Sequence, residues 1–129
     1  MNFPSDLKYT KNDEWVRVQG NTGTVGITDY AQNQLSDIVF IEVIVSVGDV
    51  VSQGDSCATV ESVKAAADVY MPVSGKVIAI NEALPDTPET INSDPYGAAW
   101  MVKVEISNAV ELEEMMDAAA YQANVESKE

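Results

Sequence analysis

Short runs rich in β-branched and aromatic residues recur along the first 106 residues, separated by glycine and other turn-forming residues. Such runs favour strands because branched and aromatic side chains pack well on a pleated sheet. Many short strands with frequent turns indicate a small β-sandwich or barrel. The pattern predicts seven strands, at 14–18, 24–27, 38–45, 56–60, 68–73, 76–80 and 100–106.

Helical periodicity occurs at two places. Thr28 is a favourable N-cap for a short helix over 29–35, because its hydroxyl can accept a bond from a free backbone N–H of the first turn. A second helix is expected over about 108–125, where Asn108 and Glu111 have the spacing of a capping box. Apolar residues recur on one face of this segment, at Leu112, Met115, Met116 and Ala119. This face is expected to pack against the β-core and not to form a groove for a partner.

Residues 81–97 follow neither period. They contain three prolines together with Asn, Asp and Thr. Proline lacks a backbone donor and cannot sustain a central strand or a long helix, so we expect an ordered loop. The whole pattern predicts a mainly β fold with a short helix in its N-terminal half and a helix at its C-terminus.

The chain has 129 residues, of which 46% are apolar, enough to bury the core of one domain. We therefore expect a single domain over 1–129, with a core at about 7–106 and the C-terminal helical segment outside it. No apolar run is long enough to cross a bilayer, and the N-terminal residues lack a targeting pattern. These observations predict a soluble, cytoplasmic protein of bacterial type. A mitochondrial matrix protein whose transit peptide had been removed would look the same.

Composition excludes several classes of function. The chain has no histidine, which removes the commonest general base and the commonest metal ligand. Cys57 is the only cysteine and has no cationic neighbour in the sequence to activate its thiol, so we expect a core residue. The formal net charge of −14 opposes binding to nucleic acid or an anionic membrane and favours partners with basic docking surfaces. The carboxylates are scattered and lack the spacing of metal ligands.

The segment 60–69 contains the candidate chemistry. Strand-like sequence enters and leaves it, so Lys64 falls near the middle of a predicted hairpin, beside Ala65, Ala66 and Ala67. A lysine alone is most often a solvated surface residue. At a hairpin tip with small neighbours its amine is accessible to a modifying enzyme, and arginine could not replace it because a guanidinium stays protonated. A long acyl chain on a rigid hairpin would raise the effective concentration of its reactive end at docked partners.

The residues Glu61-Ser62-Val63-Lys64-Ala65 resemble the lipoylation motif of the glycine cleavage H protein family. Further segments resemble that family in the family's order and extend the likeness over about 7–125. They are Tyr9-Thr10-Lys11, Glu14-Trp15-Val16, 26–32, Asp37-Ile38-Val39, 72–75, 81–84 and 91–97 with Trp100. So many ordered matches are far more specific than the lysine alone.

The resemblance implies a barrel-sandwich hybrid fold in which two small sheets present a lipoyl-lysine at a hairpin. It also implies a non-catalytic carrier with lipoate bound covalently to Lys64. The lipoyl group would take an aminomethyl group from the pyridoxal-phosphate-dependent glycine decarboxylase to the tetrahydrofolate-dependent aminomethyltransferase. Dihydrolipoamide dehydrogenase would reoxidise it, after a lipoate-attaching enzyme had installed it. We expect a monomer without nucleic acid, membrane or metal.

Four further residues are candidates for this function. Glu61, three residues before the lysine, and Gly75, eleven residues after it, resemble positions that the attaching enzyme recognises in lipoyl domains. The alternatives are a solvated strand carboxylate at Glu61 and a turn glycine with positive φ at Gly75. Glu14 and Asp68 are expected beside a cleft for the loaded arm, as hydrogen-bond partners of its amine. The alternative for Glu14 is an exposed residue before a buried tryptophan.

The chain departs from the family pattern at four places. Asp13, Ser36 and Ala67 stand where histidine, glycine and serine are usual, and Ala98-Ala99 stands where an acidic residue and glycine are common. None of these positions touches the lysine motif. We expect these four departures to alter the cleft or partner docking more than the fold.

Four other functions are alternatives on the residues alone. A biotinyl domain usually has methionines beside its lysine and a dehydrogenase lipoyl domain has an aspartate before it, whereas Val63 and Ala65 flank Lys64 here. An H-like protein that donates lipoyl groups to other proteins would share the motif, and activity with the glycine-cleaving partners would discriminate. A small carboxylate-dependent enzyme would need a paired Asp and Glu, and no such pair is recognisable.

Overall fold

The computed structural model describes residues 1–128. The strands are β1 (Lys8–Tyr9), β2 (Glu14–Gln19), β3 (Thr22–Ile27), β4 (Ile38–Val43), β5 (Val50–Val51), β6 (Ser56–Ser62), β7 (Ala66–Tyr70), β8 (Gly75–Ile80) and β9 (Val102–Ile106). The helices are α1 (Asp29–Leu35), the 3-10 helix η1 (Leu84–Asp86), α2 (Thr90–Ser93), α3 (Val110–Glu113) and α4 (Ala118–Lys128). Across the described residues, no helix is long and apolar enough to span a membrane.

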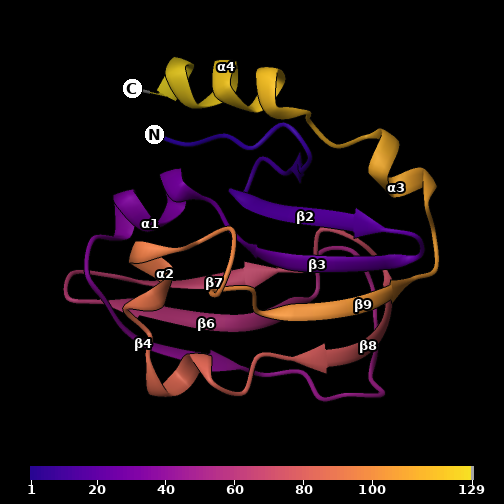
Figure 1. The fold of residues 1–129 in the computed structure, drawn as a ribbon, viewed down its shortest axis with the longest axis horizontal. Helices are drawn as coiled ribbons and strands as arrows, with labels where there is room; N and C mark the ends of the chain where they lie inside the picture. The colour runs from indigo at the N-terminus through magenta and orange to yellow at the C-terminus, as the bar shows by residue number, and fades with distance from the viewer. Residues whose placement is uncertain (129) are drawn as a thin grey trace.

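The strands form two antiparallel sheets (Figure 1). The larger sheet has the order β1-β2-β3-β9-β8-β5, and the smaller has the order β4-β6-β7. The main hydrophobic core combines buried side chains of both sheets, such as Val25 and Val104 from the larger and Ile41 and Val60 from the smaller. Two small sheets that share one core confirm the expected barrel-sandwich hybrid fold.

All seven predicted strands are present, with shifted ends. The strand predicted over 68–73 is β7, which begins earlier and ends at Tyr70. After Tyr70 the chain leaves its partner strand, and the Met71 N–H donates to the Asp55 carbonyl at 2.7 Å. Strands β1 and β5 escape the pattern because two residues are too short to display an alternation. Cys57 is buried as expected, and burial raises the pKa of its thiol to about 12, which keeps it unreactive.

The first helix is confirmed with its cap. Thr28 Oγ1 accepts from the Ala31 N–H at 3.1 Å, and α1 covers 29–35. Residues 81–97 are ordered but contain η1 and α2, which the expected loop did not include. Pro85 is compatible with η1 because it occupies the first turn, where no backbone donor is needed. The Asn92 carboxamide ties this segment to the smaller sheet by accepting from the Ile38 N–H at 2.9 Å.

The C-terminal segment predicted over 108–125 is helical, as expected, but it is not one continuous helix. α3 ends at Glu113 and α4 starts at Ala118, with a non-helical linker between them. In this linker, Met116 exchanges two backbone hydrogen bonds with Tyr9, of 2.8 and 2.9 Å. Those bonds to β1 replace the i to i−4 bonds that a continuous helix would have made.

The predicted capping box is also absent. The Glu111 carboxylate does not return to Asn108 but accepts from the backbone N–H and the hydroxyl of Ser74, both at 2.7 Å. The predicted apolar face is divided by the linker. Leu112 and Met115 pack against the main core, whereas Ala119 is exposed. The expectation that this face packs against the β-structure is thus confirmed for its first part.

A second hydrophobic cluster joins the C-terminal helix to the start of the chain. The Tyr9 and Tyr121 rings stack with centroids 4.5 Å apart, and α4 lies over the β1–β2 end of the larger sheet (Figure 1). The buried members of this cluster are Leu7, Tyr9, Trp15, Tyr30, Tyr96, Tyr121 and Val125. Aromatic packing of this kind anchors α4, whose own sequence carries little amphipathic signal.

Candidate functional site

Lys64 lies at the tip of the β6–β7 hairpin, as the sequence predicts. β6 ends at Ser62 and β7 begins at Ala66, so residues 63–65 alone connect the two strands. Lys64 is exposed, and the turn that carries it projects beyond the sheets at the left of Figure 1. Its amine is therefore presented on a supported loop and not on a flexible segment.

Ser62 shapes this tip. Its hydroxyl oxygen accepts from the backbone N–H groups of Lys64 and Ala65, at 3.3 and 3.0 Å. Its own N–H donates to the Ala65 carbonyl at 2.7 Å, and the Val63 N–H donates to the Asp37 carbonyl at 3.1 Å. These bonds fix the backbone of the tip and involve only the main chain of Lys64. A serine that closes a turn in this way is a recognisable local signal in a sequence.

Glu61 and Asp68 lie on the solvent-facing side of the smaller sheet, and both are exposed. Glu61 pairs across β6 with Phe40 on one side and Ala66 on the other. Asp68 pairs with Thr59 and lies two residues before Tyr70, on the same face of β7. Glu61 is thus a solvated strand carboxylate in this structure, and its recognition by the attaching enzyme stays a prediction.

Gly75 is buried at the start of β8, and the interpretation as a turn glycine with positive φ is wrong. A Cβ atom at this position would overlap the Glu105 carbonyl oxygen of the neighbouring strand β9. Glycine is therefore needed for the close approach of two backbones and not for an unusual dihedral angle. Its proposed contact with the attaching enzyme stays a prediction.

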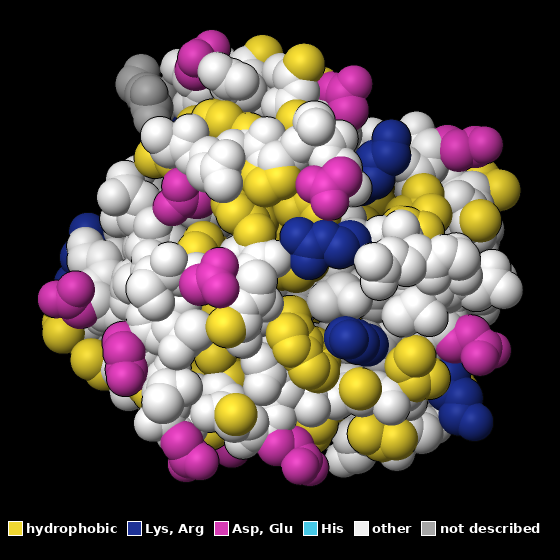
Figure 2. All heavy atoms as spheres, in the orientation of Figure 1, with side chains coloured by type: hydrophobic (Ala, Val, Ile, Leu, Met, Phe, Trp, Pro, Cys, Tyr) yellow, Lys and Arg dark blue, Asp and Glu magenta, His cyan; other side chains and the backbone are white. Residues whose placement is uncertain are grey.

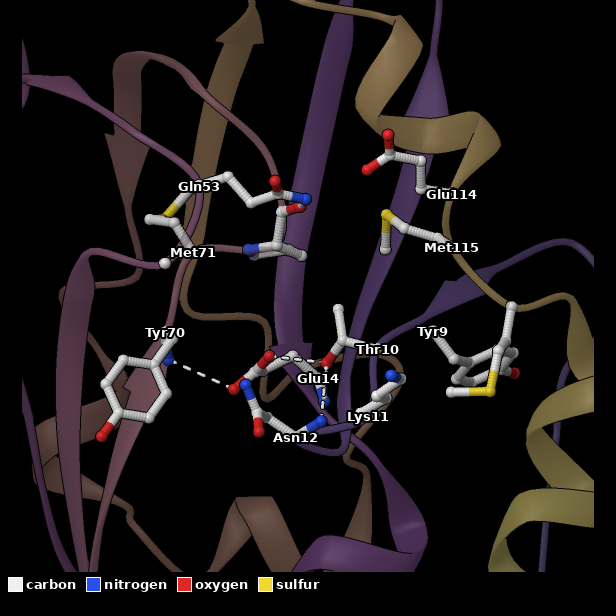
Figure 3. Close-up of a pocket in the computed structure, with 13 residues that line it drawn as sticks. Tyr9, Thr10, Lys11, Asn12, Glu14, Gln53, Tyr70, Met71, Glu114 and Met115 are labelled. Carbon is white, nitrogen blue, oxygen red and sulfur yellow. Dashed lines mark hydrogen bonds between the residues drawn. The ribbon is translucent and has the colours of Figure 1, made fainter.

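Glu14 is 2% exposed, so the interpretation as an exposed strand residue is wrong. Thr10 Oγ1 donates to Oε1 of this carboxylate at 2.6 Å, and the Tyr70 N–H donates to Oε2 at 3.2 Å (Figure 3). Burial is the largest influence and raises the pKa of the Glu14 carboxyl above its ordinary value of 4.5, while the two hydrogen bonds act in the opposite direction. A buried carboxylate with a raised pKa at the edge of a cavity is a common property of functional sites.

Glu14 lies in a pocket of about 280 Å³. Figure 3 shows it between Thr10 and Tyr70, with Met71 on one side and Met115 on the other. The lining consists of Tyr9, Thr10, Lys11, Asn12, Glu14, Gln53, Gly54, Tyr70, Met71, Pro72, Glu114, Met115 and Met116. Apolar walls around one buried carboxylate suit a ligand with an apolar stem and a cationic end.

The structure places Glu14 in the pocket but does not place Asp68 in its lining. Asp68 lies instead on β7 between the Lys64 tip and Tyr70, which contributes to the pocket rim. Sequence reasoning missed Thr10, Tyr70 and the methionine wall. No local pattern could have found them, because four distant chain segments meet at this pocket only after the sheets and the C-terminal linker have packed.

Two of the departures from the family pattern have special backbone geometry. Asp13 and Ser36 both have φ of 67°, in the left-handed region that only a few non-glycine residues adopt. The Asp13 carboxylate accepts from the Tyr121 hydroxyl at 2.9 Å and lies 3.4 Å from the Lys128 Nζ. Asp13 therefore links the loop between β1 and β2, next to Glu14, to α4.

The surface charge is acidic and dispersed. Figure 2 shows Asp and Glu side chains spread over this face of the molecule, with hydrophobic groups between them. Within residues 1–128 the ion pairs are Arg17–Asp6 at 3.6 Å and Lys128–Asp13 at 3.4 Å. Most of the 21 acidic residues are therefore available to attract partners with basic surfaces.

Comparisons with known proteins identify the family of this chain. The family model described as glycine cleavage H-protein matches residues 7–128. The glycine cleavage system H protein of Carboxydothermus hydrogenoformans is 54% identical over 97% of this chain and 95% of that protein. The protein of the same name from Anaeromyxobacter sp. strain K is 51% identical over the full length of both chains.

A solved structure has the same fold. The crystal structure of a glycine cleavage system H protein from Mycobacterium marinum superposes with a TM-score of 0.84 at 37% identity. The superposition covers 93% of this chain and 96% of that one. From the family match, the identities and this superposition we conclude that the chain belongs to the glycine cleavage H-protein family.

Proposed function

We propose that this protein is the lipoyl carrier of a glycine cleavage system, with lipoate held as an amide on Lys64 Nζ. The observation that carries the proposal is the exposed lysine at the hairpin tip within the Glu61-Ser62-Val63-Lys64-Ala65 motif. Attachment requires the Lys64 ammonium to lose a proton so that the amine can attack the carbonyl carbon of an activated lipoyl donor. The new C–N bond replaces the bond to the leaving group, and the second proton leaves to solvent.

This chain would position the lipoyl group, and its partner enzymes would catalyse the reactions. Its partners would be the glycine decarboxylase, the aminomethyltransferase, dihydrolipoamide dehydrogenase and the lipoate-attaching enzyme. When bound on Lys64, lipoate would supply a disulfide that opens on loading, so that one sulfur would carry the aminomethyl group and the other would become a thiol, and dihydrolipoamide dehydrogenase would restore the disulfide after the group has been passed on. The bacterial relatives support a cytoplasmic location for this exchange.

The Glu14 pocket fits the end of such an arm. The thioether groups of Met71 and Met115 form soft, apolar walls against which an acyl chain and sulfur atoms can pack. An amine that enters would meet the Glu14 carboxylate, whose two oxygens are oriented by Thr10 and by the Tyr70 backbone. A cation beside Glu14 would lower the pKa of that carboxyl and offset its burial, because an opposite charge favours the ionised form.

Mass spectrometry tests the attachment site. The protein is incubated with a lipoate–protein ligase, lipoic acid and ATP, and intact and peptide masses are compared with those of Lys64→Arg. We expect one lipoyl group on Lys64 of the wild type and none on the variant, because a guanidinium cannot be acylated under these conditions. A separate lipoyl domain, modified in the same tube, is the positive control. If that domain is modified while Lys64 stays bare, the proposal is wrong.

The role of the pocket has its own test. With the arm loaded by the decarboxylase, Glu14→Ala should lose the bound aminomethyl group faster than the wild type, by about tenfold if one charge-assisted hydrogen bond is removed. Glu42→Ala is the matched control, because Glu42 is an exposed carboxylate on β4 outside this pocket. Asp68→Ala tests the second predicted carboxylate. A decay rate that Glu14→Ala leaves unchanged would exclude Glu14 from retention of the group.

A further inference from the structure

The start of β4 contains a β-bulge next to the lysine tip. Ile38 pairs with Ser62 and Phe40 pairs with Glu61, so Val39 is an extra residue with no partner of its own. A bulge of this kind makes two residues face one residue of the neighbouring strand and changes the direction of a side chain. Val39 is 55% exposed and Phe40 is 44% exposed, whereas Ile38 before them is buried. The bulge therefore turns two apolar side chains to solvent, opposite Glu61.

A third exposed apolar residue belongs to the same region. Val63 precedes Lys64 and is 68% exposed, and its N–H donates to the Asp37 carbonyl at 3.1 Å. This bond holds the lysine turn against the start of β4. Val39, Phe40 and Val63 are thus exposed apolar residues on two backbone segments that this bond joins beside Lys64, and we name these three residues the tip patch. Hydrophobic and acidic side chains both reach the surface at that edge of the molecule, at the left of Figure 2.

The tip patch is not required by the fold. Isolated exposed apolar residues are ordinary, but here two consecutive residues are turned outward by a bulge while the lysine turn adds a third. Two exposed carboxylates accompany them, Asp37 just before β4 and Glu61 on β6. An apolar centre with acidic neighbours fits a partner whose docking surface combines apolar and basic side chains.

The proposed partners differ in how close to Lys64 they must act. An enzyme that attaches lipoate must bring its acyl donor to Nζ, within one lysine side chain of the backbone, so its surface must cover the residues next to the turn. The enzymes that act on the finished arm work at its far end and can stay further from the tip. We propose that the tip patch is the docking surface of the lipoate-attaching enzyme. This inference rests on the proposed function, because it presupposes that Lys64 is the attachment site.

Kinetics with conservative variants test the proposal. Val39→Thr and Val63→Thr keep the shape of the side chain and replace a methyl group by a hydroxyl group. Initial rates of lipoyl incorporation are measured by mass at a series of carrier concentrations, with the ligase, lipoic acid and ATP. We expect each variant to raise the KM for the carrier about fivefold and to leave kcat nearly unchanged, because binding and not chemistry has been weakened.

Val50→Thr is the matched control, because Val50 is 83% exposed on β5, at the edge of the other sheet. Thermal unfolding checks that all three variants are folded. Equal KM values for Val39→Thr, Val63→Thr and wild type would overturn the proposal, as would an equal rise in Val50→Thr. If the wild type takes up no lipoyl group, the proposed function itself has failed, which is a different result.

A second measurement tests the choice of partner. The variants are driven to full lipoylation with excess ligase, and dihydrolipoamide dehydrogenase is then assayed on the finished arms. We expect rates equal to wild type, because that enzyme acts at the far end of the arm. A parallel loss in this assay would show a general docking surface and would overturn the assignment to the attaching enzyme.

Discussion

Lys64 and Glu14 differ in how much of the molecule is needed to place them. The Lys64 turn is shaped by hydrogen bonds within 62–65 and by one bond to Asp37. Glu14 is enclosed by residues of four separate segments, at 9–14, 53–54, 70–72 and 114–116. The first site is therefore encoded mainly by neighbours in the chain, and the second only by the packed fold. Substitutions should separate the two sites.

Gly75→Ala should have the largest effect on stability. The added Cβ would overlap the Glu105 carbonyl oxygen, so β8 and β9 would have to separate. We expect a loss of about 3 kcal/mol in the free energy of unfolding, at the upper end of ordinary overpacking. Urea unfolding followed by circular dichroism measures it. Gly20→Ala is an informative control, because a Cβ there meets no atom and only its left-handed φ of 63° resists the change. A Gly75→Ala variant as stable as wild type would contradict the close approach.

Tyr121→Phe should lower the stability of the region around the Glu14 pocket. It removes the hydrogen bond that the Tyr121 hydroxyl donates to Asp13, at 2.9 Å, and the bond that it accepts from the Thr28 hydroxyl, at 2.7 Å, but keeps the ring stacked on Tyr9. We expect a loss of about 2 kcal/mol in the free energy of unfolding, since buried polar partners are left unsatisfied. Lipoylation of Lys64 should proceed at the wild-type rate. A slower modification of this variant would show that the tip depends on α4 and would break the contrast between the sites.

Glu14→Gln should change how the stability of the protein depends on pH. The effect should be smaller than those of Gly75→Ala and Tyr121→Phe. Because burial raises the pKa of Glu14 in the folded state above 4.5, the folded protein binds this proton more tightly than the unfolded chain does. The stabilisation of the folded state by this bound proton is fully present below pH 4.5 and is lost as the pH rises through the raised pKa. Glutamine does not ionise, so the stability of the variant should fall less than that of wild type above pH 4.5. Parallel curves from thermal unfolding at several pH values would contradict a raised pKa.

Ser62→Ala should have the smallest effect on stability. It removes the side-chain acceptor for the N–H groups of Lys64 and Ala65, which are exposed and can turn to water. We expect a loss of about 0.5 kcal/mol, near the lower limit for a hydrogen bond. Lipoylation should slow because the amine is less well placed, and Ser127→Ala, an exposed serine on α4, should leave it unchanged. If Ser62→Ala left the lipoylation rate unaltered, the tip would not depend on this serine.

The elements predicted from sequence are those whose signals are local. Thr28 and α1 agree with the structure because an N-cap acts within one turn. The predicted capping box is absent for a related reason, since Asn108 and Glu111 have the required spacing but Ser74 offers the Glu111 carboxylate two donors at 2.7 Å. A tertiary partner outcompeted the local one. Strand positions followed from composition, whereas strand ends depended on where partner strands stop.

The sequence by itself determined the family, the mainly β architecture and the position of Lys64 between two strands, because motif, turn residues and side-chain alternation act over a few residues. Only the tertiary structure decided that Glu14 is buried, that Gly75 is needed between two backbones and that Asp68 stays outside the pocket lining. Burial and close approach depend on residues far away in the chain. They come into contact only when the two sheets and the C-terminal linker pack around the shared core, which no local pattern reports.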